Sequence, residues 1–193
     1  MIYINLLWPF LFKKAMETIL ETKRLRIQPL TLEQFRLLIE GVEKMENDLM
    51  LTPSHVPLDE HTQKAMEWLY NEAQKTPEEY LWLTNWQIIL KSENKSIGSA
   101  DFKNLPGENG EVEIGYGINS EYEGRGYMTE TVEAMCKWAL IQDGVKCVIA
   151  ETEKDNYASQ RVLQKCGMEK YKETDTGFWW KLSSDNSFIY EGL

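Results

Sequence analysis

The stretch Glu123-Gly124-Arg125-Gly126-Tyr127-Met128-Thr129 decides how this sequence is interpreted. It lies between a segment that alternates like a strand and a segment with the periodicity of an amphipathic helix. Its two glycines let the backbone turn sharply and approach a ligand closely. The first turn of a helix presents unpaired N–H groups and a partial positive charge, and Arg125 can add a charge-assisted contact. The stretch therefore predicts a pyrophosphate site.

The spacing of the glycines limits which phosphate ligand fits. The stretch is neither a Walker A loop nor a complete G-x-G-x-x-G, which disfavours nucleoside triphosphates and NAD. In the preceding strand, residues 111–118, one face carries Val112, Ile114, Tyr116 and Ile118. In the following helix, residues 129–141, apolar side chains recur at helical spacing at Val132, Met135, Cys136, Ala139 and Leu140.

The remaining elements are predicted outward from this stretch. Towards the N-terminus we predict a strand at 24–30, a helix from the Thr31/Gln34 capping box, a loop at 50–57, a helix capped by Asp59, and strands within 81–90 and 95–103. Towards the C-terminus we predict a strand at 145–151, a helix from Asn156 to Gly167, and a hairpin of residues 168–171 and 177–182. This order is typical of an α+β layer fold and not of a doubly wound one.

Three separated stretches resemble the GNAT superfamily of N-acetyltransferases, especially its RimJ/RimL type. Residues 115–130 are similar to its coenzyme A loop, Asn156-Tyr157-Ala158-Ser159 with residues 162–168 to its second signature, and residues 21–25 to its first strand. The resemblance covers roughly residues 20–182 in the right order. It implies a single GNAT-type domain at 16–193, with a mixed, mostly antiparallel twisted sheet flanked by about four helices. Residues 1–15 are then an N-terminal extension of unclear role.

The resemblance also implies the coenzyme site, with acetyl-CoA as cosubstrate and no metal. The backbone amides that hold the pyrophosphate fall on Gly124, Arg125, Gly126, Tyr127, Met128 and Thr129. The end of the preceding strand, at Tyr116, Gly117 and Ile118, pairs with the pantetheine arm, and one of its N–H groups can polarise the thioester carbonyl. Asn156 contacts the coenzyme near its sulfur.

The sequence departs from the family pattern at three positions. The loop begins with Glu123, where Arg or Gln is usual, and ends with Met128, where Gly or Ala is usual. Because backbone amides hold the phosphates, neither change abolishes the site, although Glu123 can weaken coenzyme binding. The tyrosine that many members use as general acid falls on Leu163. Ser159 occupies the place of a serine proposed for that task in RimJ/RimL-type enzymes.

Amine acylation requires a proton acceptor and a proton donor. An alkyl ammonium has a pKa near 10 and must lose a proton before it attacks the thioester. Glu113 is the first candidate acceptor and Glu111 and Glu151 are its rivals, unless these carboxylates simply face solvent. Ser159 or Tyr157 can protonate the departing thiolate, and Ser159 can alternatively cap a helix.

Composition narrows the function classes further. The formal net charge of −10 argues against sequence-independent nucleic-acid binding and is compatible with a cationic amine. The three cysteines are far apart and form no CxxC pair, which argues against a zinc site and a disulfide framework and fits a reducing cytoplasm. The apolar residues 2–12 are too short to span a bilayer. They are either a membrane-surface anchor or an extension upstream of a native start at Met16.

We therefore predict a cytoplasmic acyl-CoA-dependent N-acyltransferase, a monomer or a homodimer. Its acceptor is a protein N-terminus, an amino acid or a small-molecule amine, such as a polyamine or an aminoglycoside. The alternative is a non-catalytic acyl-CoA sensor or partner-binding module, which the departures at Glu123 and Leu163 allow. A third hypothesis is a membrane-associated protein that uses residues 1–12.

Overall fold

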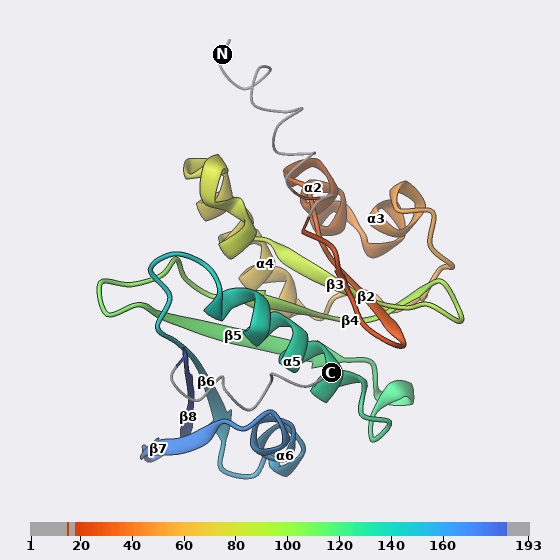
Figure 1. The fold of residues 1–193 in the computed structure, drawn as a ribbon. Helices are drawn as coiled ribbons and strands as arrows, with labels where there is room; N and C mark the ends of the chain where they lie inside the picture. Colours follow the sequence, from red (N-terminus) through yellow and green to blue (C-terminus); the bar gives the residue numbers. More distant parts are fainter. Residues whose placement is uncertain (1–14, 16–17, 185–193) are drawn as a thin grey trace.

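The computed structural model describes Ala15 and residues 18–184, which form one eight-stranded sheet with helices on its two faces (Figure 1). The sheet has the strand order β1-β2-β3-β4-β5-β6-β8-β7. Its strands are β1 (Leu20–Glu21), β2 (Leu25–Pro29), β3 (Asn85–Leu90), β4 (Lys95–Phe102), β5 (Glu111–Ile118), β6 (Cys147–Glu153), β7 (Glu169–Glu173) and β8 (Gly177–Ser183). The α-helices are α2 (Leu32–Glu40), α3 (Val42–Asp48), α4 (Glu60–Lys75), α5 (Tyr127–Leu140) and α6 (Tyr157–Lys165). The predicted α+β class is confirmed, and the short strand β1 is an addition to the predicted elements.

The pairing of β5 with β6 sets this sheet apart from a simple antiparallel one. Every other neighbouring pair is antiparallel, whereas β5 and β6 run parallel. Their register covers only Glu111–Glu113 against Cys147–Ile149, although β5 continues to Ile118. Among the described strands, none pairs with this edge of β5 beyond Glu113, so its backbone polar groups are available to a ligand.

The two faces of the sheet differ in chemistry. One face carries the buried side chains of Trp86, Phe102, Val112 and Ile114 and packs against α5, which lies in front of the sheet in Figure 1. Trp138 of α5 completes this packing, with its ring centroid 5.0 Å from that of Trp86. The opposite face carries polar residues at alternate positions, among them Asn85, Gln87, Ser99, Asp101 and Glu113. Helix α4 covers part of that face, where the Asn85 amide meets Met66.

The structure corrects four predicted boundaries. The helix predicted from the Thr31/Gln34 capping box ends at Glu40, and a separate helix, α3, begins after Gly41, where φ is +152°. The strand predicted within 81–90 begins only at Asn85, because Pro77–Trp82 form a 3-10 helix η1. Helix α5 starts at Tyr127, two residues early, directly after the left-handed Gly126. Strand β6 starts at Cys147 and not at Val145, since the N–H groups of residues 146 and 147 share the Gly110 carbonyl.

The described residues also bear on the predicted N-terminal extension. Of residues 1–15, only Ala15 is described, and it is buried at 3% exposure against the core. The apolar run 2–12 lies outside the described residues. Within the described ranges, no helix combines the length and the apolar character needed to cross a membrane.

Candidate active site

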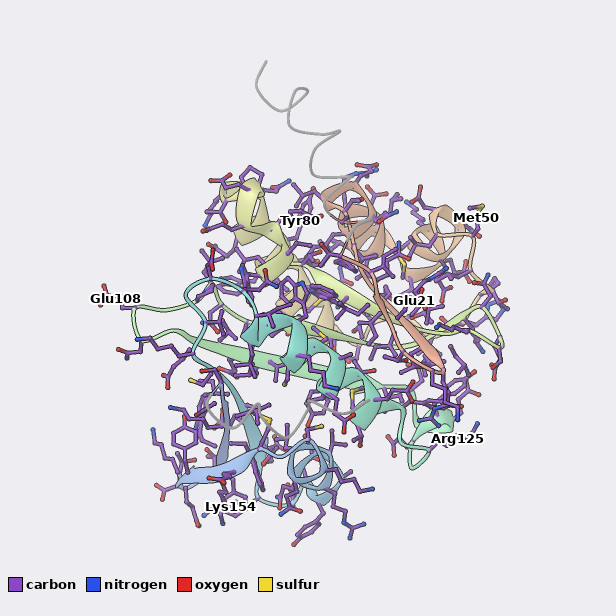
Figure 2. All side chains as sticks on the ribbon, in the orientation of Figure 1. Glu21, Met50, Tyr80, Glu108, Arg125 and Lys154 are labelled. Carbon is purple, nitrogen blue, oxygen red and sulfur yellow. The ribbon has the colours of Figure 1, made fainter. Side chains whose placement is uncertain are left out.

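A cleft of about 720 Å³ opens between the end of β5, the loop that follows it, the start of α5 and helix α6. The structure brings together nine of the ten predicted coenzyme residues along this cleft: Tyr116, Gly117, Ile118, Gly124, Gly126, Tyr127, Met128, Thr129 and Asn156. Ser159 lines it as well. Arg125 is the exception, and Figure 2 shows it at the outer end of the loop, on the side of the molecule opposite Glu108.

The loop turns into α5 through two left-handed glycines. Gly124 has φ +71° and Gly126 has φ +80°, a region that other residues enter only with strain. Gly126 is the N-cap of α5 and offers no side-chain cap, whereas α2, α4 and α6 are capped by Thr31, Asp59 and Asn156. The N–H groups of the first turn of α5 therefore remain available on the wall of the cleft. Such a helix start binds an anion.

The turn between β1 and β2 braces this loop. The carboxylate of Glu130 accepts hydrogen bonds from Thr22 Oγ1, from the Arg24 backbone N–H at 2.9 Å and from Arg24 Nε at 2.7 Å. Arg24 Nη1 donates to the Arg125 carbonyl at 2.9 Å, and its guanidinium lies 4.4 Å from the centroid of the Tyr127 ring. Burial raises the pKa of Glu130, but these hydrogen bonds outweigh it and hold that pKa below its ordinary value. The start of the domain and the loop are thus one hydrogen-bonded unit.

The cationic side chains beside the cleft are those of Arg161 and Lys165, and not the predicted Arg125. The side chain of Arg125 stacks over the Tyr122 ring, with its guanidinium carbon 5.6 Å from the centroid. Arg161 and Lys165, both exposed on α6, line the cleft instead, and Glu123 adds one negative charge. Sequence reasoning missed the two α6 cations, although their i, i+4 spacing places them on one face of the helix.

Ser159 and Tyr116 form a hydroxyl pair in the cleft. Tyr116 Oη lies 2.7 Å from Ser159 Oγ. Burial raises the pKa of Tyr116 to about 12, although the hydrogen bond with Ser159 opposes the rise. The alternative capping role falls to another residue, because Asn156 Oδ1 accepts the Ser159 N–H at 3.0 Å. The Ser159 hydroxyl is therefore not used as a helix cap.

The other predicted proton donor and the family's tyrosine position lie elsewhere. Tyr157 is 65% exposed and does not line the cleft. Leu163 is fully buried in the core, so it leaves no polar group at that position. The side chain of Tyr116, which sequence reasoning assigned only a backbone role, is the hydroxyl that meets Ser159.

The three predicted carboxylates lie away from the cleft. Glu113 forms an ion pair with Lys103 at 2.5 Å, on the face of β5 opposite Tyr116. Glu111 pairs with Lys181 at 2.7 Å, and the hydrogen bond from Lys181 lowers the pKa of this carboxyl. Glu151 is exposed on β6. None of the three lines the cleft.

A second, smaller hollow of about 240 Å³ lies on the polar face of the sheet. Residues of α2, α3 and the segment before α4 form one wall, and Gln87, Ser96 and Ser99 form the floor. Asp59 is the charged residue of its lining, and it already accepts hydrogen bonds from His61 and Thr62. The hollow shares Gly117 and Ile118 with the large cleft. Two compartments on opposite faces thus meet at the end of β5, as a reaction between two substrates requires.

The side chains that could bind a metal ion are dispersed in the described residues, and the thiols are buried. Within the part of the chain that the structure describes, no group of three or more His, Cys, Asp or Glu side chains is placed to hold a metal ion. Cys136, Cys147 and Cys166 are buried free thiols, and burial raises their pKa values.

Comparisons with known proteins agree with this geometry. The model of the acetyltransferase (GNAT) domain matches residues 24–169. The uncharacterized N-acetyltransferase YjdG of Bacillus subtilis is 32% identical over 96 residues, which are 49% of this chain and 57% of that protein. The chain spans about half the length of the curated relatives it matches.

Solved structures show the same fold at low identity. The ribosomal-protein-S5-alanine acetyltransferase of Vibrio fischeri superimposes with a TM-score of 0.62 at 16% identity, over 88% of this chain and 98% of that one. RimL, a ribosomal L7/L12 α-N-protein acetyltransferase in complex with coenzyme A, gives a TM-score of 0.62 at 17% identity, over 87% and 99%.

Proposed function

The chain belongs to the GNAT acetyltransferase family, and on this basis we propose that it transfers the acetyl group of acetyl-CoA to a primary amine by direct attack. The observation that carries the proposal is the uncapped start of α5 on the wall of a large cleft, next to the unpaired edge of β5. The first feature suits a pyrophosphate and the second suits an extended amide chain. Coenzyme A contains both.

The coenzyme is held mainly by backbone groups. The amides of residues 124–129 bind the pyrophosphate, and Tyr116, Gly117 and Ile118 pair with the pantetheine arm. Arg161 and Lys165 add positive charge near the phosphates, where Glu123 opposes it. Asn156 positions the first turn of α6 through its cap to Ser159. In this arrangement Arg125 contributes through its backbone amide and not through its guanidinium.

The leaving thiolate takes its proton from the hydroxyl pair. Ser159 and Tyr116 are within hydrogen-bonding distance of each other in the cleft, so a proton given by one is replaced by the other. Tyr116 is protonated at neutral pH, and burial raises its pKa further, to about 12. Tyr157 is a weaker candidate, since its side chain is largely exposed. Among the predicted acceptors for the amine proton, Glu113 remains the nearest to the point where β5 leaves β6.

The second hollow supports an acceptor amine without a neighbouring carboxylate. No Lys or Arg is among the residues that line it, so the carboxylate of a free amino acid would be left without a counter-ion there. A peptide N-terminus or a polyamine does not carry that charge beside its amine. The acetyltransferases of similar fold named above act on ribosomal proteins, which supports the peptide N-terminus as the first acceptor to test.

A thiol-release screen tests the proposal. Purified protein and acetyl-CoA are mixed with seryl and alanyl peptide amides, spermidine, free amino acids and an aminoglycoside, and the products are identified by mass spectrometry. We expect amide formation with the peptide amides or spermidine and none with the amino acids. Calorimetry with coenzyme A is run in parallel, with an expected stoichiometry of one per chain.

The parallel measurement separates the alternative function. Coenzyme binding without turnover of any amine would favour a non-catalytic acyl-CoA sensor, for which the cleft carboxylate of Glu123 and the apolar Leu163 are the supporting observations. Absence of both binding and thermal stabilisation at millimolar coenzyme A would contradict both functions.

A further inference from the structure

Asp101 lies one cross-strand pair away from Gly117, a residue that the cleft and the hollow share, and neither sequence reasoning nor the family resemblance singled it out. It is on β4, directly opposite Gly115 of β5. A Cβ atom on Gly115 would lie only 2.8 Å from Asp101 Oδ1, so the glycine leaves room for this carboxylate. Gly115 lies just beyond Glu113, the last residue of β5 that pairs with β6. The carboxylate is therefore next to the part of β5 that borders the cleft.

The position of Asp101 relates it to the acceptor hollow as well. Ser99 and Gly117, the neighbouring cross-strand pair on the same face, both line that hollow. Asp101 and Gly115 form the next pair along the two strands, on the same face and adjacent to the lining of the hollow.

The carboxylate of Asp101 is not engaged by the surrounding side chains. Within residues 18–184 it accepts no hydrogen bond and forms no ion pair, although it is partly buried. Lys103, two residues further along the chain and directly after β4, instead pairs with Glu113 at 2.5 Å. Glu111 is likewise held by Lys181. Asp101 is thus the carboxylate in this region whose oxygens are available to a substrate.

Burial of Asp101 favours its protonated form. Burial raises the pKa of this carboxyl to about 6, Lys103 opposes the rise and Glu113 adds to it. Lys103 directly follows β4, Glu113 lies on the same face of the sheet on β5, and the residue opposite Asp101 on β3 is the neutral Asn85. A carboxylate with a raised pKa is a stronger base at neutral pH than an ordinary one.

We propose that Asp101, in place of Glu113, accepts the proton of the acceptor ammonium, with Lys103 and Glu113 as positioning residues. This assignment rests on the proposed acetyl transfer. The ammonium gives one proton to the Asp101 carboxylate, which passes it to water. The neutral nitrogen then attacks the thioester carbon, the C–N bond forms and the C–S bond breaks. The second proton on nitrogen is lost to solvent, and the thiolate sulfur takes one from the Ser159–Tyr116 pair, which solvent replenishes.

The test compares four proteins: wild type, Asp101→Asn, Glu113→Gln, and Glu169→Gln as a control that removes an exposed carboxylate on β7. The kcat/KM for the fastest peptide amide or polyamine of the screen is measured from pH 5 to 9 at saturating acetyl-CoA. We expect wild type and Glu169→Gln to lose activity below an apparent pKa near 6. Asp101→Asn should lose about 10²-fold in kcat/KM at pH 7.5, together with that acidic limb. Coenzyme A affinity, measured by calorimetry, should stay within twofold.

A titration without coenzyme gives a second readout. Protein labelled with 13C at the aspartate side-chain carboxyl should show one resonance that titrates near pH 6 and is absent from Asp101→Asn. In Glu113→Gln this resonance and the acidic limb should both move to lower pH. The substitution removes a negative charge and releases the Lys103 ammonium, and both changes favour the ionised form of Asp101.

Three results would overturn the assignment. Wild-type rates and an unchanged acidic limb in Asp101→Asn would remove Asp101 from the reaction. Loss of the limb in Glu113→Gln alone would return the role to Glu113. If the resonance that is missing from Asp101→Asn titrates below pH 5 in wild type, that would contradict the environment inferred here. A wild-type protein that acetylates no amine would instead refute the proposed function, and the role of Asp101 with it.

Discussion

The sequence left two roles open for Ser159, helix capping and proton donation, and the structure assigns the capping role to Asn156. The amide oxygen of Asn156 caps α6 by accepting the Ser159 N–H, and the Ser159 hydroxyl meets Tyr116. Capping therefore belongs to one side chain and proton donation to the other. This separation makes the two roles distinguishable by mutation.

Ser159→Ala should lower kcat with little change in the KM for acetyl-CoA. A group that protonates the leaving thiolate acts in the transition state, and such contributions reach about 10²-fold. Melting temperature should stay near that of wild type, because the cap remains. Asn156→Ala is the matched control and should lose about 1 kcal/mol of stability. Pre-steady-state rates and melting curves on both variants check this, and an Ser159→Ala protein that is destabilised with an unchanged chemical step would refute the division.

Asp101 should make the stability of the protein depend on pH. Its folded-state pKa of about 6 lies above its ordinary value of 3.8, so the folded protein holds this proton more tightly than the unfolded chain. The penalty for ionising it is absent below pH 4 and complete above pH 6. Asp101→Asn should therefore be more stable than wild type by about 2 kcal/mol at pH 8 and equal to it at pH 4. Urea unfolding at both pH values measures the difference, and an equal effect at both would contradict the burial of this charge.

At the scale of elements, the start of α5 depends on the turn between β1 and β2, more than 100 residues earlier. Arg24 and Thr22 bind Glu130 in the first turn of α5, and Arg24 also holds the Arg125 carbonyl. The left-handed loop is thereby fixed before any ligand enters. A fixed loop loses less conformational freedom on binding, which favours affinity.

Arg24→Ala should weaken coenzyme A binding by about tenfold, because the loop must then be ordered by the ligand. Lys23→Ala removes the same charge from an exposed neighbour and should bind as wild type. In a double-mutant cycle, Arg24→Ala and Glu130→Gln should be strongly non-additive, since each breaks the same contact. Calorimetry with coenzyme A measures the affinities of wild type, the two single variants and the double variant. Additive losses of affinity would mean that Arg24 acts only through its charge.

Helix α6 should contribute electrostatically through Arg161 and Lys165. Both line the cleft, so the double variant Arg161→Ala/Lys165→Ala should lose affinity for coenzyme A and show a weaker salt dependence. Lys170→Ala/Lys172→Ala on β7 removes two exposed charges outside the cleft and is the control. Titrations at 50 and 300 mM salt, with coenzyme A and dephospho-coenzyme A, measure the effect. Equal losses in both double variants would mean that only net charge matters.

At the scale of the whole molecule, the sequence predicts well those features that depend on residues close together in the chain. Glycine spacing and helical periodicity located the loop and α5, and the capping signals of Thr31, Asp59 and Asn156 marked the starts of three helices. The break at Gly41 was missed because the apolar periodicity continues across it. Asp101 was missed because its importance depends on cross-strand register with Gly115, which no local pattern reveals.

The bracing of the loop shows the same limit. Arg24 and Glu130 are far apart in the chain, and either one alone has the appearance of a surface charge. Resemblance pointed to residues 21–25 without a reason, and the hydrogen bonds supply it. The choice among Glu111, Glu113 and Glu151 likewise required knowledge of which lysine each carboxylate meets.

The three-residue junction between β5 and β6 also has a mechanical consequence. It is a seam, that is, a weakly paired junction within the sheet, because few ladder hydrogen bonds join the block of β6, β8, β7 and α6 to the rest. Such weakly joined blocks can open as separate cooperative units. A coenzyme seated along β5 and against α6 would close that seam. Amide hydrogen exchange in residues 147–182 should therefore slow on coenzyme A binding more than in β2 and β3. Uniform slowing across the sheet would show that the two blocks already open as one. Bound coenzyme A would then also suppress local opening of this block, and its release after the reaction would restore that opening.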